Sequence, residues 1–444
     1  MDLSGKKVMV IGLARTGREC ARFLLRRGAR VLVSDLKPES ELQQEMAALA
    51  GHAIEYRCGG EAAQWLDDVD WVIPSPGVPA NSSLLCEAQR RGIGILSEIE
   101  LACRFFSFPL IAITGTNGKS TTTTLVGEML KTHGAAVFVG GNIGAPLVGF
   151  VDGPWEWGVV EISSFQLEWT EKFHPRIAVL LNVTEDHLDR YADFAAYCGA
   201  KEKIFRAQGQ DDVAVLNRED ALVWSMQDRI RSRVVSFGFS EVPEGVFSAG
   251  PEIVWREKSR EERFSLGQVK VQGIHNVENM MAAVAAVKSL GVSRDDIQKT
   301  LEEFAGLEHR LEFVREKAGV RYFNDSKGTN VGAVVKSLAS FAGPVILIAG
   351  GVDKGGNYGL LRDEIERKVK RLILFGAAKE LMANALGPFA LTVITDSMAA
   401  AVREAAAQAR AGDTVLLSPA CSSFDMFRDY AERGRVFKEL VQAL

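Results

Sequence analysis

The chain has 444 residues, of which 47% are hydrophobic and 25% charged, and its net charge is −5. This composition is typical of a soluble globular protein, and the length predicts about three domains of roughly 150 residues each. No basic stripe indicates a nucleic-acid partner, no apolar run reaches the roughly 18 residues that span a bilayer, and no cleavable leader is evident. We therefore expect a cytoplasmic protein that binds neither nucleic acid nor a membrane.

The cysteines exclude two common small-domain architectures. There are six of them, without a C-x-x-C pair: Cys20, Cys58, Cys86, Cys103, Cys198 and Cys421. Neither a zinc knuckle nor a disulfide framework is indicated by this scatter. We expect reduced and mostly buried thiols.

Short apolar runs alternate with amphipathic stretches along the whole chain, which predicts α/β structure with parallel sheets. In the first block, 1–100, strands are expected at 7–12, 30–35 and 69–73 and a helix at 18–27, with an exit from the sheet at 97–100. In the second block, 101–307, strands are expected at 109–114, 157–162 and 177–182 and a helix at 276–290. In the third block, 308–444, the same pattern recurs at 313–325, 344–349, 371–375 and 414–418. The charged, poorly periodic segment 240–263 is expected to form hairpins or loops.

A glycine-rich segment follows the predicted strand at 109–114 and precedes the helix-forming residues 124–131. It reads Gly115-Thr116-Asn117-Gly118-Lys119-Ser120-Thr121. In a phosphate-binding loop, glycines turn backbone N–H groups toward phosphates, the lysine reaches the β and γ oxygens, and a hydroxyl such as that of Ser120 or Thr121 can ligate Mg²⁺. The usual spacing has glycine where this chain has Ile113, so the loop is a variant form. A glycine turn without a ligand is the alternative.

A second glycine pattern, Gly12-x-Ala14-x-x-Gly17, follows the first predicted strand, and Asp35 ends the next strand. This pattern is similar to a dinucleotide fingerprint, in which the acidic residue binds a ribose. The methyl group of Ala14 stands where a pyrophosphate approaches the backbone, which argues against ordinary NAD binding. Another nucleotide, or a turn that only packs helix on strand, remains open.

Polar residues also stand at the ends of predicted strands. Glu161 ends one strand, and Asn182, Asp186 and His187 follow the next. Beside a phosphate loop, strand ends are where Mg²⁺ ligands are found, although a structural histidine and a capping aspartate are the alternative. The third block holds further polar clusters, which indicate a cleft or simple turns: His309-Arg310, Asn324-Asp325-Ser326-Lys327-Gly328-Thr329-Asn330 and Gly350-Gly351-Val352-Asp353-Lys354.

Taken in order, these motifs resemble those of the Mur ligase family. The resemblance also rests on these stretches: Gly141-Asn142-Ile143-Gly144, Glu161-Ile162-Ser163-Ser164-Phe165-Gln166-Leu167, Asn182-Val183-Thr184-x-Asp186-His187-Leu188-Asp189 and Ser418-Pro419-Ala420-Cys421-Ser422-Ser423-Phe424-Asp425. It covers essentially the whole chain. The last stretch, and the N-terminal Gly-Leu-Ala-Arg-Thr-Gly segment, are similar to those of the members that add D-glutamate.

The resemblance implies an enzyme that uses ATP and Mg²⁺ to join D-glutamate to UDP-N-acetylmuramoyl-L-alanine. Its chemistry would pass through an acyl phosphate and a tetrahedral intermediate and release ADP and phosphate. The implied architecture is a Rossmann-like domain at 1–100 for the UDP substrate, a P-loop ATPase domain at 101–307, and a Rossmann-like domain at 308–444 that contacts nucleotide and D-glutamate. We expect it to act as a monomer.

Residue roles follow from the resemblance, position by position. Those for the UDP substrate are Arg15, Thr16, Asp35, Lys37, Gly77 and Asn142. Those for ATP are the loop Gly115 to Thr121 with Asn279, Arg310 and Asp325, and those for Mg²⁺ are Ser120, Thr121, Glu161, His187 and Lys201. Those for D-glutamate are Thr329, Lys354, Ser423 and Tyr430, while Lys119, His187, Lys201 and Lys327 would serve catalysis. The resemblance further implies that Lys201 is carbamylated, whereas its sequence context alone favours an ordinary lysine on a helix surface.

Two other functions are compatible with parts of the sequence. A nucleotide-dependent oxidoreductase would use only the N-terminal sheet, and a P-loop switch would bind nucleotide without forming a product. Each leaves about half of the motifs without a role.

Overall fold

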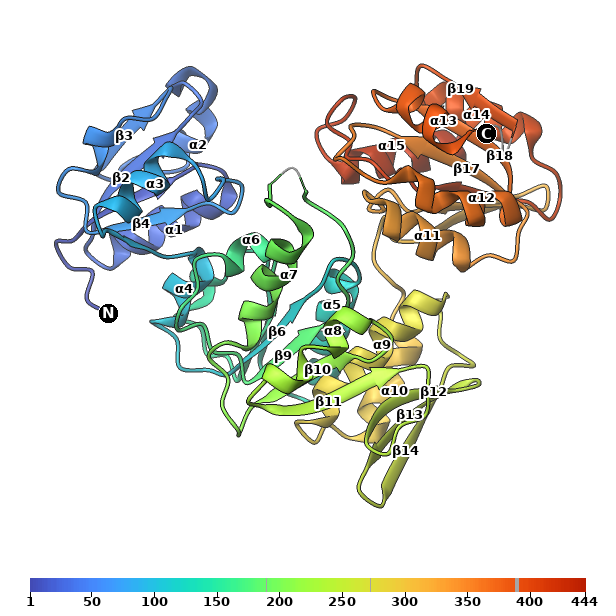
Figure 1. Cartoon of the computed structure of the whole chain (residues 1–444), viewed down its shortest axis with the longest axis horizontal. Coiled ribbons are helices and arrows are strands. Elements are labelled where there is room, and N and C mark those ends of the chain that lie inside the picture. Colours follow the sequence, from blue (N-terminus) through green and yellow to red (C-terminus); the bar gives the residue numbers. More distant parts are fainter. Residues whose placement is uncertain (189, 272, 388–390) are drawn as a thin grey trace.

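The computed structural model describes residues 1–188, 190–271, 273–387 and 391–444. Three β-sheets lie in three bodies, and the body built from the middle of the sequence lies between the other two (Figure 1). The expected α/β class is therefore confirmed. The boundaries at residues 100 and 307 stay predictions.

The first sheet is fully parallel, with the strand order β3-β2-β1-β4-β5. Its strands are β1 (Lys7–Ile11), β2 (Arg30–Asp35), β3 (Ile54–Cys58), β4 (Trp71–Pro74) and β5 (Gly94–Ile95), with helices α1 (Arg15–Arg26), α2 (Gln43–Ala47), α3 (Ser83–Arg90) and α4 (Glu98–Cys103) and short 3-10 turns η1 (Glu39–Glu41) and η2 (Ala63–Leu66). Buried Val and Ile residues dominate β1 because both faces of the sheet are covered. After β1 the chain adds β2 and β3 on one side of that strand, and it then crosses over to add β4 and β5 on the other side. The gap between β1 and β4 is therefore a topological switch point, which is where parallel sheets bind ligands.

The second sheet has nine strands in the order β14-β13-β12-β11-β10-β9-β6-β8-β7. Its strands are β6 (Leu110–Thr114), β7 (Val137–Gly141), β8 (Trp157–Glu161), β9 (Ile177–Leu180), β10 (Val213–Asn217), β11 (Arg233–Gly238), β12 (Gly245–Ala249), β13 (Glu252–Glu257) and β14 (Arg260–Ser265). Its helices are α5 (Lys119–Thr132), α6 (Ser164–Leu167), α7 (Phe194–Glu202), α8 (Ala221–Trp224), α9 (Ile274–Lys288) and α10 (Arg294–Glu303), with 3-10 turns η3 (Leu147–Phe150), η4 (Lys203–Phe205) and η5 (Gln227–Arg229). The hairpins expected at 240–263 are the antiparallel strands β12 to β14.

The third sheet has the order β15-β16-β20-β17-β18-β19, with only β15 antiparallel to its neighbour. Its strands are β15 (Glu312–Lys317), β16 (Val320–Asn324), β17 (Val345–Gly350), β18 (Val369–Phe375), β19 (Leu391–Ile394) and β20 (Thr414–Leu417). Its helices are α11 (Val331–Ala339), α12 (Arg362–Lys368), α13 (Lys379–Leu386), α14 (Met398–Gln408) and α15 (Tyr430–Gln442), with a 3-10 turn η6 (Tyr358–Leu361). The stretch expected at 313–325 is thus a hairpin, because Ala318 and Gly319 both adopt positive φ and reverse the chain.

The clusters of buried hydrophobic side chains show which of the three bodies share a core. One cluster of buried side chains runs continuously from β1 of the first sheet, at Val8, to β10 of the second, at Leu216. The two clusters of the third sheet contain buried residues only from Val320 onward. The first two bodies therefore share apolar packing, whereas the third is attached through the polar contacts described below.

The burial of the cysteines tests one expectation from the sequence. All six cysteines are free, but only Cys20 and Cys421 are buried and Cys86 is exposed, so the expectation of mostly buried thiols was wrong.

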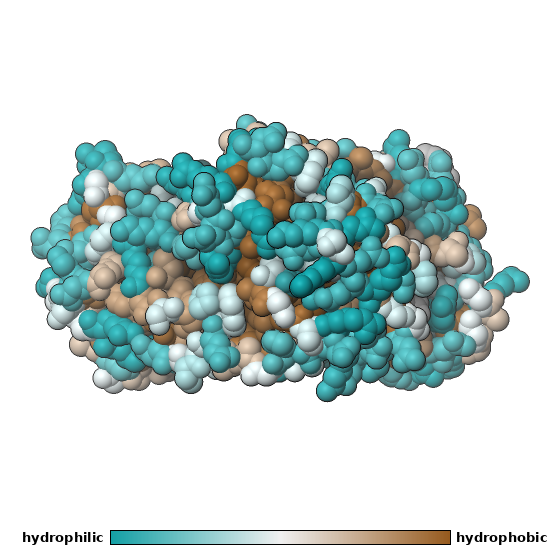
Figure 2. All heavy atoms as spheres, turned by 90° about the horizontal axis from the view of Figure 1, so that it is seen from below, coloured by the Kyte–Doolittle hydropathy of each residue, from teal (hydrophilic) through white to brown (hydrophobic). Residues whose placement is uncertain are grey.

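Hydrophilic residues cover most of the face seen in Figure 2, with hydrophobic residues in the recesses between them. No helix in the described ranges is long and apolar enough to cross a membrane.

Glu100 is on helix α4, in the linker between the first two sheets, and bonds this linker to the backbone of residues 171–173. One oxygen of its fully buried carboxylate accepts the backbone N–H groups of Glu171, Lys172 and Phe173 at 3.0, 3.0 and 2.9 Å. The other accepts from the Arg104 guanidinium at 2.9 Å. Three backbone N–H donors therefore depend on a single buried carboxylate oxygen.

Replacing Glu100 by alanine is expected to destabilise the protein by roughly 3 kcal/mol, because three N–H donors and the largely buried Arg104 guanidinium lose their acceptor. The measurement is the midpoint of the first thermal transition, which should fall by several degrees. Glu171→Ala is the matched control, since this exposed carboxylate is 3.9 Å from the Arg104 guanidinium. Equal midpoints for the two variants would contradict the assignment.

Candidate active site

The glycine-rich loop connects β6 to α5 at the centre of the second sheet. Gly118 adopts φ +87°, and a Cβ there would lie 2.2 Å from the Asn279 side chain, so only glycine fits. Asn182, after β9, fixes the loop: its side chain accepts from the Asn117 N–H at 2.8 Å and donates to the Asn117 carbonyl at 3.1 Å. Helix α5 begins directly at Lys119, so its free N–H groups face the loop. This is the geometry of an anion-binding site.

Two lysines meet at the loop. The Lys119 ammonium donates to the Gly115 and Thr116 carbonyls at 2.9 and 2.8 Å, and the Lys201 ammonium donates to the Gly115 carbonyl at 2.9 Å. Lys201 is only 2% exposed, and its ammonium lies 4.7 Å from the centre of the Tyr197 ring. Burial, and then the charge of Lys119, lower the pKa of Lys201 well below its ordinary value. The structure thus contradicts the reading of Lys201 as a surface lysine.

Glu161 ends β8, next to β6. One of its oxygens accepts from the Asn142 side chain at 2.6 Å, and the other is buried without a hydrogen-bond partner. An unpartnered buried carboxylate oxygen, at the end of a strand that packs against helix α5 and close enough to Lys119 to act on its charge, suits a divalent cation. In the part of the chain that the structure describes, no three His, Cys, Asp or Glu side chains gather to hold a metal by themselves. Hydroxyl and phosphate oxygens would therefore have to complete any Mg²⁺ shell.

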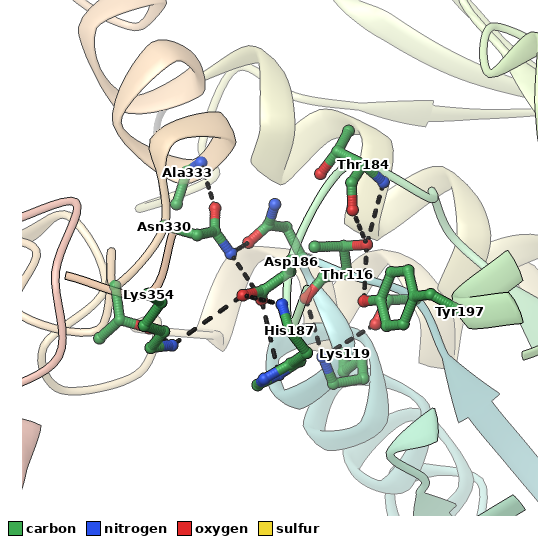
Figure 3. A network of polar contacts seen from close by, with 12 residues as sticks. Thr116, Lys119, Thr184, Asp186, His187, Tyr197, Asn330, Ala333 and Lys354 are labelled. Atoms are coloured by element: carbon green, nitrogen blue, oxygen red, sulfur yellow. Dashed lines mark hydrogen bonds and ion pairs between the residues drawn. The ribbon is translucent and has the colours of Figure 1, made fainter. Parts of the chain in front are cut away.

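A polar network links the loop to the third body (Figure 3). The Asn330 side chain donates to Asn117 at 3.3 Å and to the Asp186 carboxylate at 3.1 Å, while its own oxygen caps helix α11. The Lys354 ammonium lies 4.0 Å from Asp186 on the same side. His187 follows with φ +57°, and its ring contacts the Phe165 ring at 4.7 Å. The network brings residues of the second and third sheets to one point.

A pocket beside the loop contains the three residues outside the loop that are expected to bind ATP, which are Asn279, Arg310 and Asp325. It is lined by, among others, Asn117, Gly118, Thr121, Asn279, Arg310, Asp325 and Lys327. The Arg310 guanidinium also donates to the Ser120 hydroxyl at 2.9 Å, which ties the linker between the second and third bodies to the loop. The Asp325 carboxylate accepts from the Ser337 and Ser418 hydroxyls, both at 2.7 Å, and burial raises its pKa to about 6.

The four residues expected to contact D-glutamate, which are Thr329, Lys354, Ser423 and Tyr430, all lie on the third body. The Lys354 ammonium lies 3.5 Å from the Thr329 hydroxyl. The Lys327 ammonium lies 3.7 Å from the centre of the Tyr430 ring, and burial, then Arg310, lower its pKa to about 7. The Ser423 hydroxyl is buried without a partner, so it has capacity for a ligand.

The residues expected to hold the UDP substrate lie mainly at the carboxyl edge of the first sheet. Arg15 and Thr16 open α1 after β1, Asp35 ends β2 and Lys37 follows it, and Gly77 follows β4. Asp35 accepts the N–H groups of Leu13 and Lys37 at 2.8 and 3.0 Å and so holds together the segments that follow β1 and β2. Gly17 provides close helix–strand packing, since a Cβ there would lie 1.9 Å from the Gly12 carbonyl. Asn142 lies apart from this group, beside Glu161.

Several side chains of the site were not among the residues expected from the sequence. Tyr197, one turn before Lys201 on α7, bonds the Thr116 hydroxyl at 3.0 Å. Arg433 is fully buried and donates to the Ser326 carbonyl at 2.8 Å and the Cys421 carbonyl at 3.1 Å, which fixes the two loops that carry the third body's ligand residues. Neither Tyr197 nor Arg433 gave a local signal in the sequence, because only the tertiary structure brings each of them to its partners.

Comparison with known proteins bears on this arrangement. Three family models match in chain order: "Mur ligase MurD-like, N-terminal domain" at residues 6–97, "Mur ligase middle domain" at 113–287 and "Mur ligase, glutamate ligase domain" at 309–421. The UDP-N-acetylmuramoylalanine–D-glutamate ligase of Geobacter metallireducens is 49% identical over 100% of this chain and 99% of its own. The chain belongs to the Mur ligase family. The ligase of the same name from Trichlorobacter lovleyi is 46% identical over 100% of both chains.

Solved structures of Mur ligases share the fold at low sequence identity. UDP-N-acetylmuramate–alanine ligase MurC from Thermotoga maritima aligns with a TM-score of 0.60 at 20% identity, over 98% of this chain and 99% of its own. MurF from Acinetobacter baumannii aligns with a TM-score of 0.64 at 18% identity, over 99% of this chain and 91% of its own. The three-body architecture of the chain is therefore that of Mur ligases.

Proposed function

We propose that the chain is an ATP-dependent ligase of peptidoglycan precursor synthesis that joins D-glutamate to UDP-N-acetylmuramoyl-L-alanine. The observation that carries this proposal is the full-length identity of 49% to a ligase of that name. The arrangement of the three bodies supports it, because the first presents most of the residues expected for the UDP substrate, the second the loop expected for ATP, and the third those expected for D-glutamate. A single chain supplies all three groups, so we propose that it acts as a monomer, in the cytoplasm where ATP is available.

The proposed reaction activates a carboxylate with ATP. The terminal alanine carboxylate attacks the γ-phosphorus, the bond to ADP breaks, and an acyl phosphate forms. The D-glutamate amine then adds to the acyl carbon, and the tetrahedral intermediate expels phosphate and leaves an amide. Phosphoryl transfer depends mainly on positioning and on neutralising charge, which the N–H groups of the loop and the ammonium of Lys119 are placed to provide.

Mg²⁺ would neutralise charge on the ATP phosphates when bound. Its proposed protein ligands are Ser120 or Thr121 and Glu161, with His187 and a carbamylated Lys201 at a second ion. The unpartnered Glu161 oxygen supports the first assignment. The buried, depressed-pKa amine of Lys201 supports the second, because only a neutral amine captures CO₂.

Lys354 is proposed to select an acidic amino acid, since its part-buried ammonium lies near both the Thr329 hydroxyl of the third body and the Asp186 carboxylate of the second. Lys354→Ala should raise the KM for D-glutamate by about 10 to 100-fold, roughly 1.4 to 2.8 kcal/mol, and leave the KM for ATP nearly unchanged. The measurement is steady-state kinetics with each substrate varied in turn. Lys370→Ala is the matched control, since that lysine of the same body pairs with Asp413. An equal rise in the KM values for D-glutamate and ATP would show a general structural defect instead.

The proposed function is tested by omitting one substrate at a time. With ATP, Mg²⁺, UDP-N-acetylmuramoyl-L-alanine and D-glutamate, the protein should form the UDP-linked dipeptide and release ADP and phosphate in equal amounts. Steady nucleotide hydrolysis without the other substrates would identify a P-loop switch, and binding of NAD with hydride transfer would identify an oxidoreductase.

A further inference from the structure

Arg190 joins the first two bodies at a point that the proposed reaction does not explain. Its guanidinium forms a two-point ion pair with Glu168, at 3.1 and 2.7 Å. The same group donates to the Pro76 carbonyl at 2.7 Å and the Val78 carbonyl at 3.0 Å, in the loop after β4 of the first sheet. It also lies 4.0 Å from the centre of the Phe165 ring. The side chains of Arg190 and Glu168 are only 11% and 10% exposed, so this is a built, largely dry junction.

The two carbonyls flank Gly77. In a trans peptide the C=O and the following N–H point in opposite directions, so a Pro76 carbonyl held by Arg190 turns the Gly77 N–H away from the junction. The Val78 N–H bonds the Ser75 carbonyl at 2.9 Å and closes the turn from the other side. The orientation of the Gly77 amide is therefore set by Arg190 and by this turn.

The fold itself does not require glycine at position 77. Its φ is outside the left-handed region, and a Cβ added there would meet no atom within 4 Å. The residue is exposed and beside the switch point between β1 and β4. Glycine lets a ligand approach the backbone closely, so its presence beside the switch point suits a ligand contact.

We propose that Arg190 is a positioning residue for the UDP substrate: it clamps the loop 75–78 so that the Gly77 N–H faces the crevice as a donor to an acceptor oxygen of the UDP-sugar. The inference rests on the proposed function. Arg190 lies three residues after His187, so the segment that enters the phosphate site also fixes the first sheet. Its guanidinium suits this task because its planar donors serve two carbonyls and a carboxylate at once.

The test compares binding of UDP-N-acetylmuramoyl-L-alanine and of ADP by calorimetry in the wild-type protein and three variants. Arg190→Ala should raise the Kd for the UDP substrate at least about tenfold and change that for ADP by less than about twofold. Arg190→Lys should fall between, since an ammonium reaches Glu168 or one carbonyl but not both carbonyls. Arg27→Ala is the matched control, because Arg27 also joins the first two bodies, through Asp152, yet lies away from Gly77. It should leave both values unchanged.

The outcomes separate this inference from the proposed function. Wild-type protein that bound no UDP substrate would overturn the proposed function and, with it, the role of Arg190. Wild-type affinity in Arg190→Ala would overturn the clamp alone. Equal losses of affinity for ADP and for the UDP substrate in the two Arg190 variants, together with lowered thermal midpoints, would also overturn the clamp. Such a result would show that the Arg190 junction is purely structural.

Discussion

Lys119→Ala is expected to lower kcat at least about 100-fold, a loss of roughly 3 kcal/mol of transition-state stabilisation. The side chain starts helix α5 and folds over the loop, where the carbonyls of Gly115 and Thr116 hold its ammonium. Burial lowers the pKa of Lys119, and the nearby Glu161 carboxylate opposes this shift. Incoming phosphate oxygens would compete with the two carbonyls for the same ammonium, and the charge that develops in the transition state strengthens that contact.

The measurement is single-turnover and steady-state kinetics at saturating substrates. Lys131→Ala is the matched control, because Lys131 is on the same helix but is exposed and pairs with Glu128. Near-normal turnover by Lys119→Ala would remove the phosphate-loop assignment, even though the backbone geometry of the loop would stand.

Lys201→Ala is expected to abolish most activity if Lys201 works as a carbamate. The amine is buried, donates to the Gly115 carbonyl and lies over the Tyr197 ring. Burial and Lys119 favour the neutral form, and a neutral amine adds to CO₂ to give a carbamate with release of one proton. The new anion would sit beside Lys119 and could supply an oxygen to Mg²⁺.

Chemical rescue separates a carbamate from an ordinary structural lysine. Formate or acetate should enter the space vacated in Lys201→Ala and restore part of the activity, because either supplies the missing oxygens. Chloride at the same ionic strength is the control and should restore none. Full activity of the variant in CO₂-depleted buffer would contradict the carbamate.

The sequence predicted the parts of the site that depend on neighbouring residues. The loop Gly115 to Ser120 was recognisable because strand, glycines, lysine and helix follow one another. The helix after it was expected at 124–131, yet α5 starts at Lys119. Its threonine run lowers helix propensity, but Thr122 and Thr123 are fully buried, and this packing outweighs propensity.

Contacts between distant segments gave no local signal. Asn330 and Asp186 are 144 positions apart, and Arg190 and Pro76 are 114 apart. Each pair is made by the packing of whole bodies, so neither spacing nor periodicity could reveal it. Lys201 illustrates the same limit: α7 shows no clear apolar face, and only the tertiary structure buries the lysine.

The most direct test of the central claim, ligation through an acyl phosphate, follows the oxygens of the alanine carboxylate. The UDP substrate is prepared with oxygen-18 at both carboxylate positions and turned over with ATP, Mg²⁺ and D-glutamate. Acyl-phosphate formation transfers one labelled oxygen to the released phosphate and leaves the other in the new amide, with ADP as the nucleotide product. Label in AMP, or phosphate released without label while the amide forms, would contradict the account.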